Sequence, residues 1–185
     1  KETEMKARNN RNRRWWIGLI CVWLVFPAAA QLSVDTASAE ELDSLKNILS
    51  VSEQPSRRIP ALSRLAMLYM QQPEEISYQV QLYQEAKAAD SIPAVYGALR
   101  HLSRYYYNLY GMRDSILYWG GLVDSIARSR GEYPNELFDV QCYSCQDLLW
   151  SQNYEMALNE AMEIYQEASR RKHIYGMVRC SESLG

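Results

Sequence analysis

The stretch Leu65-Ala66-Met67-Leu68-Tyr69 decides the fold, because its pattern, in which the second residue is small, returns along the chain. It returns as Leu102-Ser103-Arg104-Tyr105-Tyr106, as Ser144-Cys145-Gln146-Asp147-Leu148 and as Leu184-Gly185. The small residues stand at positions 66, 103, 145 and 185, so the spacings are 37, 42 and 40 residues. A small residue at one place in each unit lets a neighbouring helix approach closely. The period therefore predicts pairs of α-helices stacked as repeats.

The rest of the chain fits an all-α fold of about eight antiparallel helices. Glycine (8) and proline (6) are scarce, which favours long helices over a turn-rich β fold. Apolar residues recur at helical spacing, and proline or glycine stands at the boundaries. We expect a linker and a first helix in residues 31–56, with Ser38 and Glu41 forming a capping box at that helix's start. Further helices are expected at about 57–72, 74–89, 93–109, 114–130, 135–151, 154–171 and from 174 onward.

The N-terminal residues 1–30 are typical of an export signal. A basic segment precedes an apolar run of 12 residues, 15–26, and Ala28-Ala29-Ala30 then offers a cleavage site before Gln31. The run is shorter than the roughly 20 residues that span a bilayer. A cleaved signal peptide is the first interpretation, and an uncleaved anchor is the alternative. Both place the remaining chain outside the cytoplasm, because the basic residues precede the apolar run.

The charge of the remaining chain argues against a nucleic-acid partner. After residue 30 the sequence holds 14 basic and 20 acidic residues, a net charge of −6. Nucleic-acid binding depends on neutralising phosphates, so an acidic chain is poorly suited to it. The chain begins at Lys1 rather than methionine and ends within an expected helix. We therefore expect a fragment of a longer protein, with its last repeat truncated.

Asn153-Tyr154-Glu155-Met156-Ala157-Leu158 resembles the opening of the second helix of a tetratricopeptide repeat, and the stretches that begin at Leu65 and Leu102 resemble its first-helix core. The resemblance covers residues 57–185, although the units are longer than the family's common 34 residues. It implies a right-handed superhelix of helix pairs. It also implies that the following residues pack between helices: Leu65, Ala66, Tyr69, Leu102, Ser103, Tyr106, Cys145, Tyr154 and Ala157.

A narrower resemblance rests on the export signal and on Asp114-Ser115-Ile116-Leu117-Tyr118 within long, tyrosine-rich repeats. This combination is similar to the extracytoplasmic part of Bacteroidetes-type sensor histidine kinases and related membrane-anchored regulators. It implies a sensory or protein-interaction module with a protein or peptide partner, or self-association, ahead of a transmembrane helix and a signalling part. A free-standing secreted scaffold is the alternative. A helical enzyme would need acidic residues that converge at one end, and the sequence offers no such cluster.

The first helices of the repeats offer a candidate binding groove. In a stacked repeat they line the concave side. Two arginines beside aromatic residues are suited to an acidic or extended peptide, and an ordinary solvated face is the alternative. The candidate residues are Arg100, Arg104, Tyr107, Asn108, Gln146 and Trp150. Glu155, Glu160, Glu163 and Glu167 on a second helix are expected on a solvated convex face.

The sequence supports no catalytic, metal or cofactor site. Cys142 and Cys145 are three residues apart within an expected helix, and Cys180 follows downstream. Buried packing is the favoured interpretation, with a disulfide or metal and redox chemistry as alternatives. His101 and His173 lack the partners that a catalytic base needs and are expected at the surface or in connectors. We therefore expect this segment to be a binding module rather than an enzyme.

Overall fold

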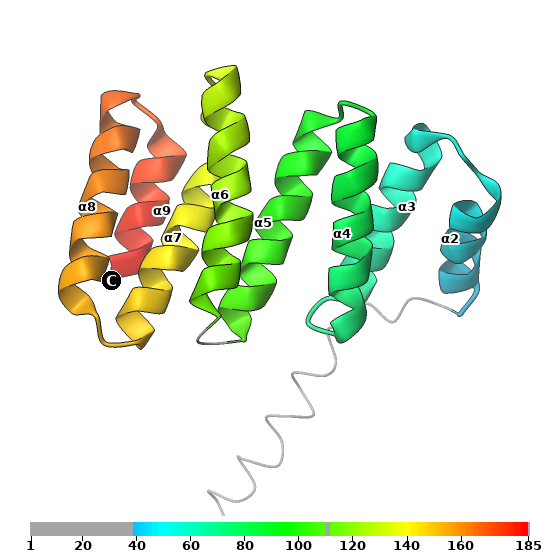
Figure 1. The fold of residues 1–185 in the computed structure, drawn as a ribbon, viewed down its shortest axis with the longest axis horizontal. Helices are drawn as coiled ribbons and strands as arrows, with labels where there is room; N and C mark the ends of the chain where they lie inside the picture. The colour runs from blue at the N-terminus through cyan, green and yellow to red at the C-terminus, as the bar shows by residue number, and fades with distance from the viewer. Residues whose placement is uncertain (1–38, 110–111, 185) are drawn as a thin grey trace, which may run out of the picture. The chain divides into compact units, whose positions relative to one another are not determined.

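The computed structural model describes residues 39–109 and 112–184, and within these ranges the chain forms eight helices and no strand. This confirms the all-α prediction. The helices are α2 (Ala39–Val51), α3 (Pro55–Leu68), α4 (Pro73–Ala88), α5 (Ile92–Asn108), α6 (Arg113–Arg130), α7 (Asn135–Trp150), α8 (Tyr154–Arg170) and α9 (Ile174–Leu184) (Figure 1). The expected signal peptide 1–30, the linker that follows it, Ser38, Gly111 and Gly185 lie outside the described residues.

Prolines mark several helix starts. Pro55 and Pro73 are the first residues of α3 and α4, where a missing N–H costs nothing because the first turn has no partner for it. Helix α3 begins before the expected boundary near residue 57 and includes Pro60. Pro60 removes one backbone hydrogen bond close to the N-terminal end of α3, where the chain is exposed to solvent.

Consecutive helices pack against one another from α2 to α9, and the first helices of successive pairs also touch, α5 against α7 and α7 against α9. The buried positions follow a shared register. Helix α6 buries residues 116, 120, 123 and 127, and α8 buries residues 157, 161, 164 and 168, each 41 positions later. The same side of each second helix therefore packs onto the core.

Most residues expected to pack between the helices do so. Leu65, Ala66, Leu102, Cys145 and Ala157 are at most 1% exposed. The side chain of Ser103 is buried as well, and its Oγ donates to the carbonyl of Ile116 at 3.3 Å. Tyr69 and Tyr106 are half-buried.

The packing prediction is wrong for Tyr154, whose side chain is 64% exposed. Tyr154 is the first residue of α8. Because side chains on a helix lean toward its N-terminus, this ring leans off the end of the helix instead of onto α9.

Four of the connections between helices share one turn. Asp90, Gly131, Gln152 and Lys172 have φ between 52° and 66°, the left-handed conformation. The N–H of the residue after each of them donates to a carbonyl five residues back, at 2.8–2.9 Å. These are Schellman turns, in which the left-handed residue satisfies carbonyls at the end of the preceding helix.

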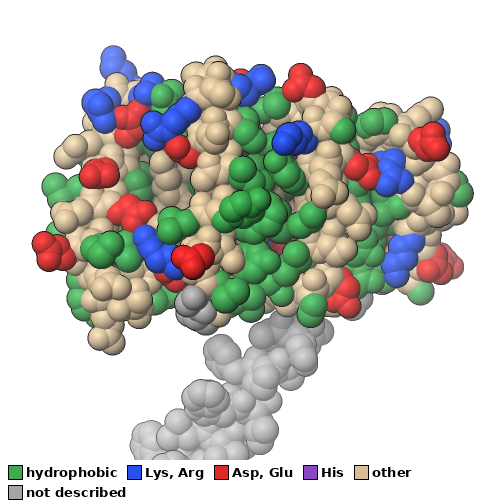
Figure 2. Space-filling model, in the orientation of Figure 1, with side chains coloured by type: hydrophobic (Ala, Val, Ile, Leu, Met, Phe, Trp, Pro, Cys, Tyr) green, Lys and Arg blue, Asp and Glu red, His purple; other side chains and the backbone are tan. Residues whose placement is uncertain are grey.

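Hydrophobic and charged side chains are unevenly distributed over the surface of the helices (Figure 2). Figure 2 shows hydrophobic side chains gathered over the middle of the face that carries α4, α5 and α6, with charged side chains on both sides of them. None of the helices in the described ranges is long and apolar enough to cross a bilayer.

Candidate functional site

The carboxylate of Asp139 links three helices, α5, α7 and α9, which are the first helices of successive pairs. Asp139 lies on α7 and is 4% exposed. Its Oδ1 accepts from the Tyr175 hydroxyl at 2.7 Å and from Arg179 Nε at 3.1 Å, both on α9, and its Oδ2 accepts from Arg100 Nη1 on α5 at 3.2 Å. Burial and this hydrogen bond raise the pKa of Tyr175 to about 12, so the hydroxyl stays a donor. The network fixes α5, α7 and α9 in one arrangement.

A second buried carboxylate holds Arg104. Glu75, on α4, is 2% exposed, and its Oε1 accepts from Arg104 Nη2 at 3.2 Å. Its Oε2 accepts from the backbone N–H of Gln71 at 2.6 Å. One carboxylate therefore binds both the Arg104 side chain and the backbone of the turn before α4. Glu75 lies in the first turn of α4, where a carboxylate favours the helix N-terminus. Its buried position gives it a further role as the counter-ion of Arg104.

His101 lies between the two arginines and stays neutral. Burial, together with the charges of Arg104 and Arg100, lowers its pKa to about 4. Its Nε2 is 3.1 Å from Arg100 Nη2, which matches a neutral ring accepting from the guanidinium. The expectation of a surface histidine is therefore wrong for His101. Arg100 and Arg104, which flank His101 in the sequence of an amphipathic helix, were the signal that this histidine is held neutral.

Three aromatic rings of α5 and α7 form a stack. Tyr107 on α5 lies between two rings of α7, Tyr143 at 5.1 Å and Trp150 at 4.6 Å between centroids, with interplanar angles of 23° and 17°. Tyr143 is buried, whereas Trp150 is 47% exposed. The guanidinium of Arg179 lies 5.8 Å from the centre of the Tyr143 ring. The stack therefore runs from the core to an indole that faces solvent.

Of the sequence-predicted groove residues, the structure brings Tyr107 and Trp150 into contact, and the others lie on the same two helices. We call the set the α5–α7 face and define it by Arg100, Arg104, Tyr107, Asn108, Gln146 and Trp150. Asn108 is exposed at the end of α5, and Gln146 is half-buried on α7. The prediction missed the two carboxylates and Tyr143. A charged residue inside the apolar run 137–140 of α7 was the sequence signal for Asp139. Because both arginines are bound to buried carboxylates, their guanidiniums are held in place at the surface.

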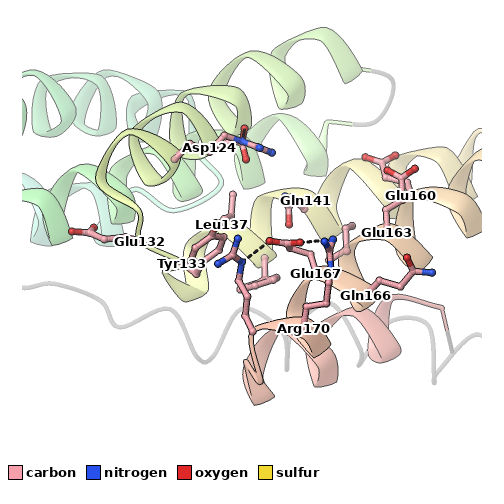
Figure 3. Close-up of a pocket in the computed structure, with 14 residues that line it drawn as sticks. Asp124, Glu132, Tyr133, Leu137, Gln141, Glu160, Glu163, Gln166, Glu167 and Arg170 are labelled. Carbon is pink, nitrogen blue, oxygen red and sulfur yellow. Dashed lines mark hydrogen bonds and ion pairs between the residues drawn. The ribbon is translucent and has the colours of Figure 1, made fainter.

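A separate hollow of about 500 Å³ lies between α6 and α8, with α7 beneath it (Figure 3). Its charged groups are mostly paired with one another. Arg128 Nε donates to Asp124 at 2.6 Å, and Glu167 binds both Arg170 and Arg171. Hydrogen bonding to Arg171 lowers the pKa of Glu167. The guanidinium of Arg171 also stacks on the Tyr133 ring, 3.3 Å from its centroid.

The glutamates expected on a solvated face differ in position. Glu155 and Glu163 are exposed, whereas Glu160 and Glu167 are half-buried. Glu160 accepts from the Ser144 hydroxyl at 2.7 Å, and Glu163 lines the hollow with it. Among the described residues no group of three histidine, cysteine or acidic side chains is arranged to hold a metal ion. The hollow is therefore a polar surface built from internal ion pairs.

Cys142, Cys145 and Cys180 are free and buried. The Sγ of Cys145 donates to the carbonyl of Ala157 at 3.1 Å, and that of Cys180 to the carbonyl of Ala161 at 2.9 Å. Burial raises the pKa of Cys142 and of Cys145 to about 11, and it raises the pKa of Cys180 too. A thiol that resists ionisation is a poor nucleophile and a poor metal ligand. These observations favour the packing interpretation.

No family model, no curated protein and no solved structure matches the chain.

Proposed function

We propose that this chain is an extracytoplasmic, TPR-like protein-interaction module that binds an extended peptide on the α5–α7 face. The carrying observation is the stack of Tyr143, Tyr107 and Trp150, which ends in an exposed indole. The guanidiniums of Arg100 and Arg104, on the same helix as Tyr107, are each fixed by a buried carboxylate. An exposed tryptophan on a rigid base is a common anchor for a partner. Fixed guanidiniums suit carboxylates because their donors are already oriented.

The right-handed TPR-like superhelix is part of this proposal. The shared register of α6 and α8 and the contacts of α5 with α7 and of α7 with α9 support it. In such a stack the first helices line one continuous surface, which suits an extended peptide better than a compact ligand.

Peptide selection on the purified chain tests the binding role. We expect selected peptides to be enriched in acidic and aromatic residues. Trp150→Ala is expected to weaken their binding about 10-fold or more, as for a central anchor. Tyr118→Ala is the matched control, because Tyr118 is 61% exposed but lies on α6. Equal binding by wild type and Trp150→Ala would remove the α5–α7 face from the proposal.

We further propose that the module is the sensory part of a membrane-anchored two-component sensor or regulator. The predicted export signal in residues 1–30 and the long tyrosine-rich repeats support this role. The gene provides the test. A downstream apolar span of about 20 residues followed by a signalling segment supports the sensor. A stop codon shortly after a capping helix supports a free-standing secreted scaffold instead.

A further inference from the structure

The run of helices has two edges, each formed by the ends of helices. The ends at which α3 meets α4, α5 meets α6 and α7 meets α8 lie along the lower edge of Figure 1, and the other junctions from α4 to α9 lie along the upper edge. In stacked repeats a further repeat packs onto the last helix pair, in the direction of the run, and not onto an edge. Both edges are therefore surfaces of the module at any length of the stack.

The lower edge exposes large apolar side chains at all three junctions. The first junction carries Met67 and Met70, the second Leu109 and Met112, and the third Tyr154 and Met156. We call these six residues the turn edge, and each of them is 41–64% exposed. Single exposed apolar residues are ordinary on a protein surface. Their return at the same place in three successive helix pairs indicates a surface that contacts something apolar.

Acidic side chains accompany the turn edge, and basic ones are scarce there. Among the described residues 67–75, 107–109, 112–115 and 150–157, Arg113 is the one basic side chain, and it is bound to Asp147 and Glu160. The first turn of each second helix carries one exposed carboxylate, and these are Glu74, Asp114 and Glu155. The lower edge is therefore apolar and negatively charged.

The upper edge has the opposite charge character. Figure 2 shows lysine and arginine side chains along it. The exposed basic residues at its three junctions are Lys87, Arg130, Arg170, Arg171 and Lys172. Ile174 is an exposed apolar side chain among them. The two edges would therefore respond differently to the same charged or apolar surface.

The form of the turn edge suits a lipid layer better than a folded protein. Its side chains stand on separate junctions in a row, whereas the centre of a protein interface is a continuous, closely packed patch. A fluid lipid layer adapts to separate side chains, and aromatic residues such as Tyr154 favour the level of the headgroups. Zwitterionic headgroups present ammonium groups to water, which complement the three exposed carboxylates, whereas anionic headgroups would repel them.

We propose that the turn edge rests on a bilayer of zwitterionic lipids. The six apolar side chains then lie between the headgroups, and Glu74, Asp114 and Glu155 lie beside the headgroup ammonium groups. The helices stand upright on the membrane, with the basic edge pointing away from it. The α5–α7 face is formed by the sides of upright helices and stays open, so this contact does not depend on peptide binding there.

The methionine methyl groups test the contact within one chain. Four of the seven methionines belong to the turn edge, namely Met67, Met70, Met112 and Met156. The full chain, labelled with ¹³C in its methionine methyl groups, is added to phosphatidylcholine bicelles that contain a spin-labelled lipid, which broadens the NMR signals of nearby groups. We expect strong broadening of these four signals.

Met162 is the matched control in that spectrum. It is 49% exposed but lies about 9 Å further along α8 than Met156, at 1.5 Å per residue. We expect little broadening of its signal. The comparison is made between methyl groups of the folded part, so it holds whether or not residues 1–30 enter the bicelle. Equal broadening of Met162 and Met156, or no broadening of the four signals, overturns the proposal.

Substitution of the exposed methionines tests apolar insertion directly. Met67→Glu with Met112→Glu is expected to reduce the broadening of Met156 at least about 5-fold, because charged side chains enter an apolar layer at a high cost. Met162→Glu is the control and is expected to leave that broadening unchanged. An unchanged Met177 signal in both variants shows that they are folded. Full broadening of Met156 in the double variant would refute insertion at the other two junctions.

The lipid charge and the chain concentration separate the remaining alternatives. Bicelles of anionic phosphatidylglycerol are expected to broaden the four signals less than phosphatidylcholine does, since like charges repel. Stronger broadening by the anionic lipid would contradict the proposed role of the three carboxylates. Turn-edge signals that ignore both lipids but shift with chain concentration would identify a second copy of the chain as the occupant instead.

Discussion

Gly176 sets how closely α9 approaches α7. A Cβ atom at this position would lie 2.7 Å from Cδ1 and Cε1 of Phe138, whose ring is buried in the core. Gly176→Ala is therefore expected to lower the free energy of unfolding by about 1–3 kcal/mol, as in an overpacked core. Urea denaturation measures this.

Gly97→Ala is the matched control for that measurement. Gly97 also lies inside a helix, and nothing stands within 4 Å of an added Cβ. Because alanine favours helix more than glycine does, this variant is expected to gain about 0.5–1 kcal/mol. Similar effects of the two substitutions would show that α9 and α7 are not in close contact at Gly176.

His101 is expected to make stability depend on pH. Its pKa is about 4 in the folded chain and about 6.5 when unfolded, so the unfolded state binds the proton more strongly between these values. The stability that neutral His101 contributes is complete above pH ~6.5 and is lost as the pH falls toward 4, up to about 3 kcal/mol.

Comparison of wild type with His101→Gln isolates this contribution, because carboxylates that titrate nearby are present in both chains. The difference in unfolding free energy between the two is expected to shift with pH between 6.5 and 4. In an NMR titration the imidazole of His101 is expected to change protonation near pH 4. An NMR midpoint near 6.5 would show that His101 is not held neutral by burial.

At the scale of helices, Asp139 joins α5, α7 and α9. Asp139→Asn keeps the shape but removes the charge that Arg100 and Arg179 share. The side chains of the two arginines are 34% and 21% exposed, so water offsets part of the loss. We expect a loss of about 2–4 kcal/mol in the free energy of unfolding, somewhat below that of a fully buried pair.

The control for Asp139→Asn is Asp124→Asn, since Asp124 also pairs with an arginine, Arg128, whose side chain is 73% exposed. A surface pair of this kind contributes little, so the change is expected within about 0.5 kcal/mol. Equal losses in the two variants, measured by thermal and urea unfolding, would mean that Asp139 does not tie the three helices together.

The helices could be predicted from the sequence because their signals are local. Pro73, Pro93 and Gly131 mark helix boundaries within a few residues. The spacing of apolar residues between these boundaries indicates helix rather than strand. The partners of the arginines could not be predicted in this way. Asp139 lies 39 residues from Arg100, and Glu75 lies 29 residues from Arg104. Such pairs depend on how helices pack, and a periodic pattern carries no information on that.

At the scale of the whole described chain, the end helix α2 is packed against fewer helices than the central helix α7. Helix α2 contacts α3 and buries none of its residues, whereas α7 contacts α5, α6, α8 and α9 and buries ten. In stacked repeats stability comes from contacts between neighbours. Amide hydrogens of α2 are therefore expected to exchange fastest among the helices and those of α7 slowest, measured by hydrogen exchange with mass spectrometry. Equal protection of α2 and α7 would indicate one all-or-none unit.

The Schellman turns have a consequence for how such a chain can change its length. Asp90, Gly131, Gln152 and Lys172 close four junctions with the same backbone geometry, although only one of them is glycine. At both ends of a helix pair that lies between two such turns, the backbone has the same geometry as at the ends of the neighbouring pairs. Duplication or deletion of a pair at these points thus preserves the path of the chain on either side. Whole helix pairs, rather than single residues, are then the step by which a chain of this design can be lengthened or shortened without a change in the backbone path.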